Sequence, residues 1–172
     1  MADPLRIEPL DATHDTAAFD CGQPELNRWL ERYALLDQRT GVSRTMVLSR
    51  GAEVLGFYAL APASIQCAEA PPPLAEDMGN FPVPVVILAR LAVALDEQDK
   101  GYGSELLRDA MVRAARGADA VGGRALIVHA KDEEAAHFYQ HFDFEPSPTD
   151  PLHLFLPMDA LTRWLNDVDL YP

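Results

Sequence analysis

A run of nine residues, Val85 to Val93 (VVILARLAV), constrains the fold more than any other stretch of the sequence. Eight of its residues are apolar, and Arg90 alone interrupts them. Such a run is typical of a central strand that is buried on both faces of a sheet. It falls well short of the roughly 18 apolar residues that a membrane-spanning helix needs. We therefore expect a sheet at the centre of the molecule and no association with a membrane.

The segments around this run predict a mixed α/β domain, because strands come first and strands then alternate with helices. The predicted strands cover residues 5–10, 45–49, 54–61, 124–130 and 152–156. The predicted helices cover residues 23–38, 101–116, 132–139 and 159–165. Six of the fourteen prolines lie between residues 62 and 84, which predicts a loop with a short helical turn near 74–78.

Length and composition are those of an ordinary globular protein. The chain has 172 residues, of which 48% are hydrophobic and 24% charged, enough for one domain over residues 1–172. Cys21 and Cys67 have no paired spacing, so we expect neither a disulfide nor a metal site. The histidines that lack ligand-like spacing are His129, His137, His141 and His153. The N-terminus has no apolar signal core, which favours a cytoplasmic location.

The net charge of −13 argues against nucleic acid, but the charge is unevenly distributed. Residues 28–50 contain five arginines against two acids, and residues 100–131 contain six bases against three acids, so each segment carries +3. Such an island is either a solvated face or a local anion-binding surface. In the first island, Arg28, Arg32 and Arg39 share one side of the predicted helix, and Arg44 lies just beyond it.

A glycine-rich turn, Gln98-Asp-Lys-Gly101-Tyr-Gly103-Ser104, follows the apolar run and opens a predicted helix. Glycines allow backbone N–H groups to converge, and a helix N-terminus adds unpaired donors, so the turn suits a pyrophosphate. Two other nucleotide motifs fit poorly. Leu106 occupies the third glycine position of the dinucleotide fingerprint, and Lys100 precedes the glycine that it should follow in a P-loop. The glycines alone are equally compatible with a turn that binds nothing.

The turn resembles the Q/R-x-x-G-x-G/A motif of the GNAT superfamily of acetyl-CoA-dependent N-acetyltransferases. Leu-Ala-Val at 91–93 resembles the splayed strand of that family. Ala135-x-x-Phe138-Tyr139, followed by Phe142-Asp143-Phe144, resembles its A-x-x-F-Y-x-x-x-G-F segment, with Asp143 in place of glycine. Aspartate tolerates left-handed backbone, so we expect a turn there nonetheless. The resemblance, over about residues 5–157, implies a mixed central sheet splayed at the acetyl-CoA site, with helices on both faces.

The resemblance also implies the site residues. Backbone groups of 91–93 hold the pantetheine arm of acetyl-CoA, and those of 98–104 hold its pyrophosphate. The implied acetyl-CoA contacts are Leu91, Ala92, Val93, Gln98, Asp99, Lys100, Gly101, Tyr102, Gly103, Ser104, Ala135 and Phe138. Tyr139 is the implied general acid for the departing thiolate, and packing is its alternative role. No general base is evident, since Asp96 and Glu97 are more simply solvated loop acids. An α-amine, whose pKa is about 7.7–8.0, needs a base less than lysine does.

The N-terminal half resembles the toxin branch of the GNAT proteins. The matching segments are Phe19-Asp-Cys21-Gly22, Leu26-Asn27-x-Trp29-Leu30, Gly41-Val-Ser43-Arg-Thr45, Gly56-Phe-Tyr58-x-Leu60 and Arg-Ala-Leu-Ile-Val-His-Ala at 124–130. The branch implies acetylation of the α-amine of aminoacyl-tRNA, an antitoxin of the ribbon-helix-helix type and a homodimer. The residues that would contact the acceptor are Arg28, Arg32, Arg39, Arg44 and Arg90. Arg90 either pairs with an acid or faces the acceptor cleft, since an unpaired buried charge is costly.

Two alternatives remain on the sequence alone. In the first alternative, the acceptor is an amine of a small molecule or a protein. The acidic chain would attract such an amine in its protonated, cationic form. The second is a GNAT-fold module that binds CoA, or only a partner protein, without catalysis. An intact Tyr139 and an intact glycine turn argue against the second alternative.

Overall fold

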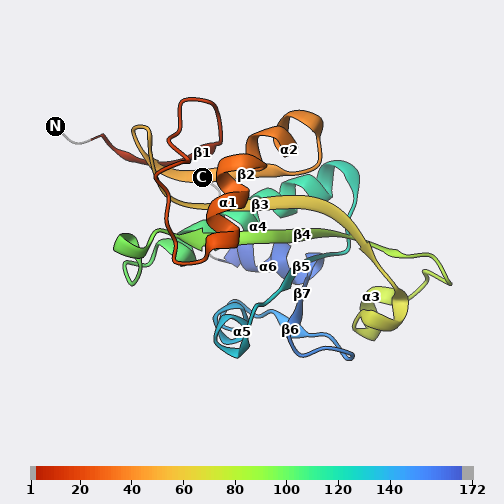
Figure 1. The fold of residues 1–172 in the computed structure, drawn as a ribbon. Coiled ribbons are helices and arrows are strands. Elements are labelled where there is room, and N and C mark those ends of the chain that lie inside the picture. The colour runs from red at the N-terminus through yellow and green to blue at the C-terminus, as the bar shows by residue number, and fades with distance from the viewer. Residues whose placement is uncertain (1–2, 168–172) are drawn as a thin grey trace. The chain divides into compact units, whose positions relative to one another are not determined.

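The structure is a computed structural model that describes residues 3–167 (Figure 1). The strands are β1 (Leu5–Pro9), β2 (Arg44–Arg50), β3 (Glu53–Ile65), β4 (Val83–Val93), β5 (Ala125–His129), β6 (Glu145–Pro146) and β7 (His153–Pro157). The α-helices are α1 (Pro24–Arg32), α2 (Ala34–Thr40), α3 (Pro72–Ala75), α4 (Tyr102–Val121), α5 (Glu133–Gln140) and α6 (Met158–Asp167). Two short 3-10 turns are η1 (Cys67–Glu69) and η2 (Leu95–Glu97). Within this described part, no helix is long and apolar enough to cross a membrane.

The seven strands form one mixed sheet in the order β1-β2-β3-β4-β5-β7-β6. Strands β1, β2 and β3 pair antiparallel, β4 and β5 pair parallel, and β7 pairs antiparallel with both β5 and β6. The described residues group into two compact units. Unit 1 contains the chain up to Ala61 together with Ala89–Ala110, and unit 2 contains Pro62–Leu88 together with the chain from Met111 onward.

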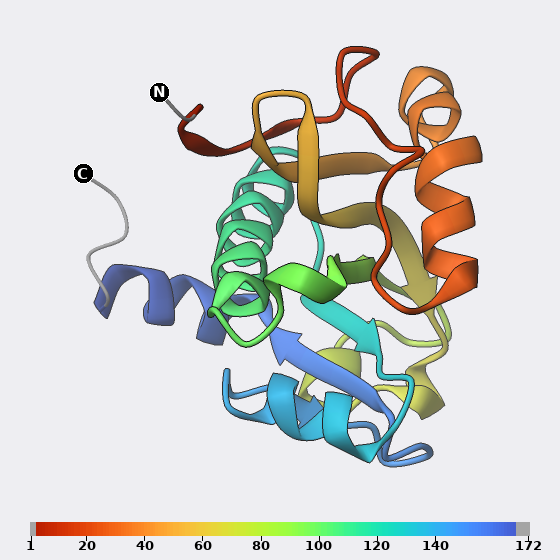
Figure 2. The same ribbon diagram turned by 60° about the vertical axis from the view of Figure 1, so that its left-hand side comes forward.

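In unit 1, helices pack on both faces of β2 and β3. Helices α1 and α2 cover one face, and the first turns of α4 cover the other (Figure 2). On the first face, the ring of Trp29 stacks on Phe57 with 5.9 Å between ring centroids. On the other face, a Cβ added to Gly56 would meet Leu106 Cδ1 at 2.8 Å and the Ala92 carbonyl oxygen at 3.0 Å. Gly56 therefore leaves room for the close approach of Leu106 and of the β4 backbone.

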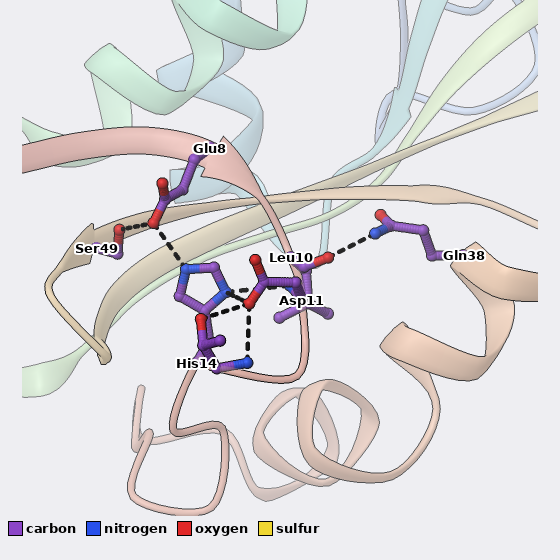
Figure 3. A network of polar contacts seen from close by, with 7 residues as sticks. Glu8, Leu10, Asp11, His14, Gln38 and Ser49 are labelled. Atoms are coloured by element: carbon purple, nitrogen blue, oxygen red, sulfur yellow. Dashed lines mark hydrogen bonds and ion pairs between the residues drawn. The ribbon is translucent and has the colours of Figure 1, made fainter.

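The single helix predicted over 23–38 is wrong, because the structure has two helices that meet at Tyr33, where φ is −121° and ψ −29°. The break lets α2 turn toward the sheet. There Gln38 Nε2 donates to the Leu10 carbonyl at 2.6 Å (Figure 3). Gln38 Oε1 accepts from the Thr45 amide at 2.9 Å. These tertiary hydrogen bonds outweigh the local preference for one continuous helix.

A buried histidine that the sequence analysis did not single out ties β1 to β2. His14 Nε2 and Ser49 Oγ both lie 2.8 Å from Glu8 Oε1, and the Asp11 amide donates to His14 Nδ1 at 3.1 Å (Figure 3). Since Nδ1 of the neutral ring accepts this hydrogen bond, Nε2 carries the hydrogen that is donated to Glu8. The hydrogen bonds from His14 and Ser49 lower the pKa of Glu8. The network fixes the start of the segment that leads to α1.

Several other boundaries differ from the predictions. Strand β3 continues to Ile65, past Pro62, and α4 continues to Val121. The helical turn in the proline-rich segment is Pro72–Ala75, earlier than predicted, and the two-residue β6 was not predicted. The apolar run does form the central strand β4, but it is not buried on both faces, since Ala89 is exposed and Val86, Ile87, Leu91 and Val93 are partly exposed.

The proline-rich segment of unit 2 is anchored rather than loose. The Arg124 guanidinium donates to the carbonyls of Leu74 at 3.3 Å and Glu76 at 2.9 Å, and Ser147 Oγ donates to the Glu69 carbonyl at 2.7 Å. Leu74 packs into a buried cluster with residues of β5 and β7. At the ends of these two strands, the rings of His129 and His153 stack with centroids 4.0 Å apart.

Helix α5 begins as the sequence predicts and ends one residue later than predicted, at Gln140. Asp132 is its N-cap and accepts a hydrogen bond from the Ala135 amide at 2.8 Å. After the helix, Asp143 has a φ of +69°, which confirms that it takes the left-handed turn usually made by glycine.

We expect Asp143→Ala to lower the free energy of unfolding by about 1 kcal/mol, because alanine tolerates left-handed backbone less well. Asp143→Gly is the matched variant and should not lower stability, since glycine adopts this conformation freely. Urea unfolding of the three proteins measures the difference. Equal losses in both variants would show that the aspartate side chain, and not the backbone, stabilises the turn.

Candidate active site

The turn between β4 and α4 is closed by the glutamine of the glycine motif. Gln98 Nε2 donates to the Val93 carbonyl at 3.0 Å and lies 3.4 Å from the Cys21 carbonyl oxygen. The Leu95 amide donates to the Asp20 carbonyl at 2.9 Å. These contacts hold residues 94–101 against the end of β4 and against the segment that leads to α1.

The glycine turn presents backbone donors at the start of a 20-residue helix. Gly101 has a φ of +85°, and no heavy atom lies within 4 Å of the position where its Cβ would be. Helical hydrogen bonding begins with the Glu105 amide, which donates to the Gly101 carbonyl at 3.2 Å. The amides of Tyr102, Gly103 and Ser104 precede that bond and lie at the positive end of the helix dipole. They fit a pyrophosphate, as the motif predicts.

Charged side chains around this turn are paired. Lys100 Nζ lies 2.9 Å from Glu97 Oε2, and Arg50 Nη1 lies 3.9 Å from Glu97 Oε1. The hydrogen bond to Glu97 raises the pKa of Lys100. Glu97 is thus engaged by two cations and its side chain is only 13% exposed, so its interpretation as a solvated loop acid is wrong. Asp96 and Asp99 are exposed.

The C-terminal part of strand β4 extends beyond its pairing with β5, so a ligand could pair with its backbone there. Its hydrogen-bonded register with β5 covers Val86–Leu88, and the strand continues through Ala89–Val93. Within that continuation Ala92 is buried, whereas Leu91 and Val93 are partly exposed. The three predicted pantetheine contacts therefore follow the part of the strand that β5 uses.

A cavity of about 350 Å³ lies in unit 1 beside residues 94–97 and was not predicted. Its acidic lining residues are Asp15, Asp20, Glu53, Asp96 and Glu97. Their carboxylates would repel a phosphate, so this cavity does not suit the pyrophosphate of acetyl-CoA.

Helix α5 of unit 2 carries the predicted acid. The Tyr139 side chain is buried, and its ring centroid lies 5.2 Å from that of Phe138 and 5.6 Å from that of Phe144. Burial raises the pKa of Tyr139 above its ordinary value. The phenol therefore keeps its proton at neutral pH and can donate it, but it does not form the phenolate that a base requires. Ala135 and Phe138, in the same helix, are partly exposed.

The basic residues are distributed differently from the prediction. Arg28, Arg32, Arg39 and Arg44 are all exposed. Arg28 and Arg32 lie one turn apart on α1, but the break at Tyr33 places Arg39 on α2, and Arg44 begins β2. The prediction that three arginines share one side of one helix is therefore wrong, although all four remain in unit 1.

Within residues 3–167, Arg90 forms no ion pair, but its guanidinium packs on an aromatic ring. Its guanidinium carbon lies 4.0 Å from the centroid of the Trp29 ring. Trp29 belongs to the segment Leu26-Asn27-x-Trp29-Leu30 that resembles the toxin branch, and nothing in the sequence connects it with Arg90. The two residues are 61 positions apart, so no local spacing reports the contact.

The free strand end and the open glycine turn are compatible with the predicted binding of coenzyme A through backbone groups. The acetyltransferase (GNAT) domain family matches residues 41–146. The chain belongs to this GNAT family, which confirms the fold, the N-acetyltransferase activity and acetyl-CoA as cosubstrate.

Known relatives span nearly the whole chain. A tRNA-acetylating toxin of Mycobacterium tuberculosis is 49% identical over 164 residues, which cover 95% of this chain and 96% of that protein. The solved structure of AtaT complexed with acetyl-methionyl-tRNAfMet is 30% identical, with a TM-score of 0.85 over 94% of this chain and 99% of that one. A tyrosine-to-phenylalanine mutant of AtaT, bound to the C-terminus of the antitoxin AtaR and acetyl-CoA, is 30% identical, with a TM-score of 0.80 over 95% and 99%.

Proposed function

We propose that this protein is a toxin that transfers the acetyl group of acetyl-CoA to the α-amine of an aminoacyl-tRNA. The observation that carries the proposal is the 49% identity to a tRNA-acetylating toxin over almost the full length of both chains. The four exposed arginines of unit 1 support it, because they offer an RNA phosphate local positive charge on an acidic protein.

Each part of the site has a separate task in this reaction. The backbone of Leu91–Val93 and of Gln98–Ser104 holds acetyl-CoA, which supplies the acetyl thioester. As the acetyl–nitrogen bond forms and the carbon–sulfur bond breaks, the Tyr139 hydroxyl gives its proton to the departing sulfur. The α-amine gives up one proton to solvent as it becomes an amide, and solvent returns one proton to the Tyr139 oxygen, so that the products are the amide and the CoA thiol. Because its pKa is about 7.7–8.0, much of it is already unprotonated, and the site needs no strong base.

The proposal includes the setting of the reaction. We place the protein in the cytoplasm, where aminoacyl-tRNA is found, with an antitoxin as its partner. The complex of AtaT with AtaR supports an antitoxin. The ribbon-helix-helix type of that antitoxin, and a homodimer, follow from the toxin-branch motifs in the N-terminal half.

Net charge favours a different acceptor. A chain with −13 attracts cations, which suits a small-molecule or protein amine. Within a Debye length of about 8–10 Å, however, the local charge of unit 1 matters more than the total. The aminoacyl-tRNA proposal therefore takes precedence, and the acidic body should make RNA binding sensitive to salt.

Expression in a bacterial host tests the function. We expect the wild-type protein to arrest growth and to leave N-acetylated aminoacyl ends in the tRNA pool, whereas Tyr139→Phe should do neither. Wild-type protein that accumulates in the cells without arresting growth or modifying the tRNA pool would contradict the proposal.

Acetyl-CoA binding should depend on the backbone of the glycine turn. Gly101→Ala should weaken acetyl-CoA affinity at least about tenfold, because a positive φ is costly for alanine and relief of the strain moves the amides. Gly41 is a matched control, since its φ is +81° and it also has no heavy atom within 4 Å of a Cβ. Gly41→Ala should cost similar stability and leave the affinity unchanged. Calorimetry with acetyl-CoA measures the affinity of both variants. Equal affinities of Gly101→Ala and Gly41→Ala would contradict the assignment of the glycine turn to acetyl-CoA binding.

A further inference from the structure

Arg90 is held over an aromatic platform in unit 1. Its guanidinium carbon lies 4.0 Å from the centroid of the Trp29 ring, and Trp29 itself stacks on Phe57. Trp29 and Phe57 are both buried in the same cluster as Ala92. The platform is therefore part of a packed core, and a cation–π contact orients the guanidinium plane above it.

The same guanidinium has no acceptor for its N–H groups. Among residues 3–167, no oxygen accepts a hydrogen bond from Arg90, and no carboxylate lies within 4.0 Å of it. Burial lowers the pKa of Arg90, and the negative charge of Asp37, beyond ion-pair distance, opposes that shift. The five N–H donors of this half-buried cation are therefore available to an acceptor from outside the chain.

The position of Arg90 in the fold is compatible with a contact between its N–H groups and the aminoacyl-tRNA. It directly precedes Leu91–Val93, the strand segment assigned to pantetheine, and strand residues advance by about 3.3 Å each. Its contact with Trp29 places the side chain on the face of the sheet that α1 and α2 cover, and these helices carry Arg28, Arg32 and Arg39. The guanidinium is therefore on the sheet face that the arginine-bearing helices cover, and the Arg90 backbone adjoins the strand segment assigned to pantetheine.

We propose that Arg90 is a specificity-determining residue that binds a phosphate close to the aminoacylated end of the RNA, and that Trp29 is its positioning residue. This proposal rests on the proposed function. A planar guanidinium with both edges unpaired matches a phosphate with two parallel hydrogen bonds, which an ammonium group cannot do. An acceptor amine without a phosphate would not form these hydrogen bonds with Arg90.

The test measures binding of purified aminoacyl-tRNA at several salt concentrations, together with acetyl-CoA affinity. Arg90→Ala should weaken RNA affinity by about 10- to 100-fold, the loss of a charge-assisted bidentate contact. It should also reduce the slope of log affinity against log salt by about 0.7–0.9, the value for one phosphate. Arg90→Lys should restore the salt slope and only part of the affinity. Acetyl-CoA affinity should stay within about twofold in both variants if the fold is intact.

Two variants of Trp29 test whether the ring orients the Arg90 guanidinium, and one variant of Arg163 serves as a control for loss of charge. Trp29→Phe should retain most of the RNA affinity because a ring remains under the guanidinium, and Trp29→Leu should lose about tenfold. Arg163→Ala removes an exposed arginine of α6 that takes no part in the proposal, and it should change neither quantity.

The outcomes distinguish this inference from the proposed function. If the wild type acetylates aminoacyl-tRNA but Arg90→Ala binds it with unchanged affinity or unchanged salt slope, the role of Arg90 is wrong and the function stands. If Arg90→Ala also loses acetyl-CoA affinity, Arg90 is a structural residue and the inference is wrong. A wild type that neither binds nor acetylates aminoacyl-tRNA overturns both.

Discussion

Replacement of Tyr139 by phenylalanine is expected to lower kcat by about 100-fold or more while acetyl-CoA affinity stays within about twofold. The change removes one oxygen from a buried ring whose contacts with Phe138 and Phe144 remain. Packing is therefore preserved, and only the proton donor is lost. Steady-state kinetics and calorimetry with acetyl-CoA measure the two quantities separately.

Tyr58→Phe is the matched control. The Tyr58 hydroxyl donates a hydrogen bond to Asp109 Oδ2, so its removal should cost about 1 kcal/mol of stability without lowering kcat. Because burial raises the pKa of Tyr139 above 10.0, ionisation of this phenol should not reduce the wild-type kcat at any pH up to about 10. A fully active Tyr139→Phe enzyme would show that the tyrosine serves packing alone.

The second large effect is expected from Arg28→Glu/Arg32→Glu. The two arginines are exposed and one turn apart on α1, so the double reversal replaces two positive charges by two negative ones on one surface. We expect KM for aminoacyl-tRNA to rise by about 100-fold at 0.15 M salt and the salt dependence to decrease. Acetyl-CoA affinity should not change.

Arg6→Glu/Arg163→Glu provides a control with the same change in net charge. Both residues are exposed, and neither belongs to the proposed site. If this control raises KM as much as the α1 variant does, the effect comes from the total charge of the protein. The assignment of RNA contacts to α1 would then be wrong.

Local features were the predictable part of this protein. The apolar run did identify the central strand, Asp132 did identify the start of α5, and Asp143 did adopt the left-handed turn that its residue type allows. Each of these depends on residues that are neighbours in the sequence. The glycine turn belongs to the same group, since its strand, its glycines and its helix are contiguous.

Features that depend on distant contacts were not predictable. The apolar spacing over 23–38 suits one helix, and only the contacts of Gln38 with Leu10 and Thr45 show why the chain breaks at Tyr33. The stacking of Arg90 on Trp29 likewise joins a strand to a helix 61 residues earlier. Sequence spacing identified Arg90 as unusual, but only the structure shows what holds it.

Acetylation of purified aminoacyl-tRNA by purified protein tests the central claim most directly. The protein is incubated with acetyl-CoA and a mixture of charged tRNAs, and nuclease digestion followed by mass spectrometry identifies the terminal adenosine esters. We predict N-acetyl-aminoacyl adenosine, formed with the release of one CoA per acetyl group, no product from uncharged tRNA, and formation about 100-fold slower with Tyr139→Phe. The contradicting result is an enzyme that leaves every aminoacyl end unmodified in this assay but releases CoA when an amine of another kind is added.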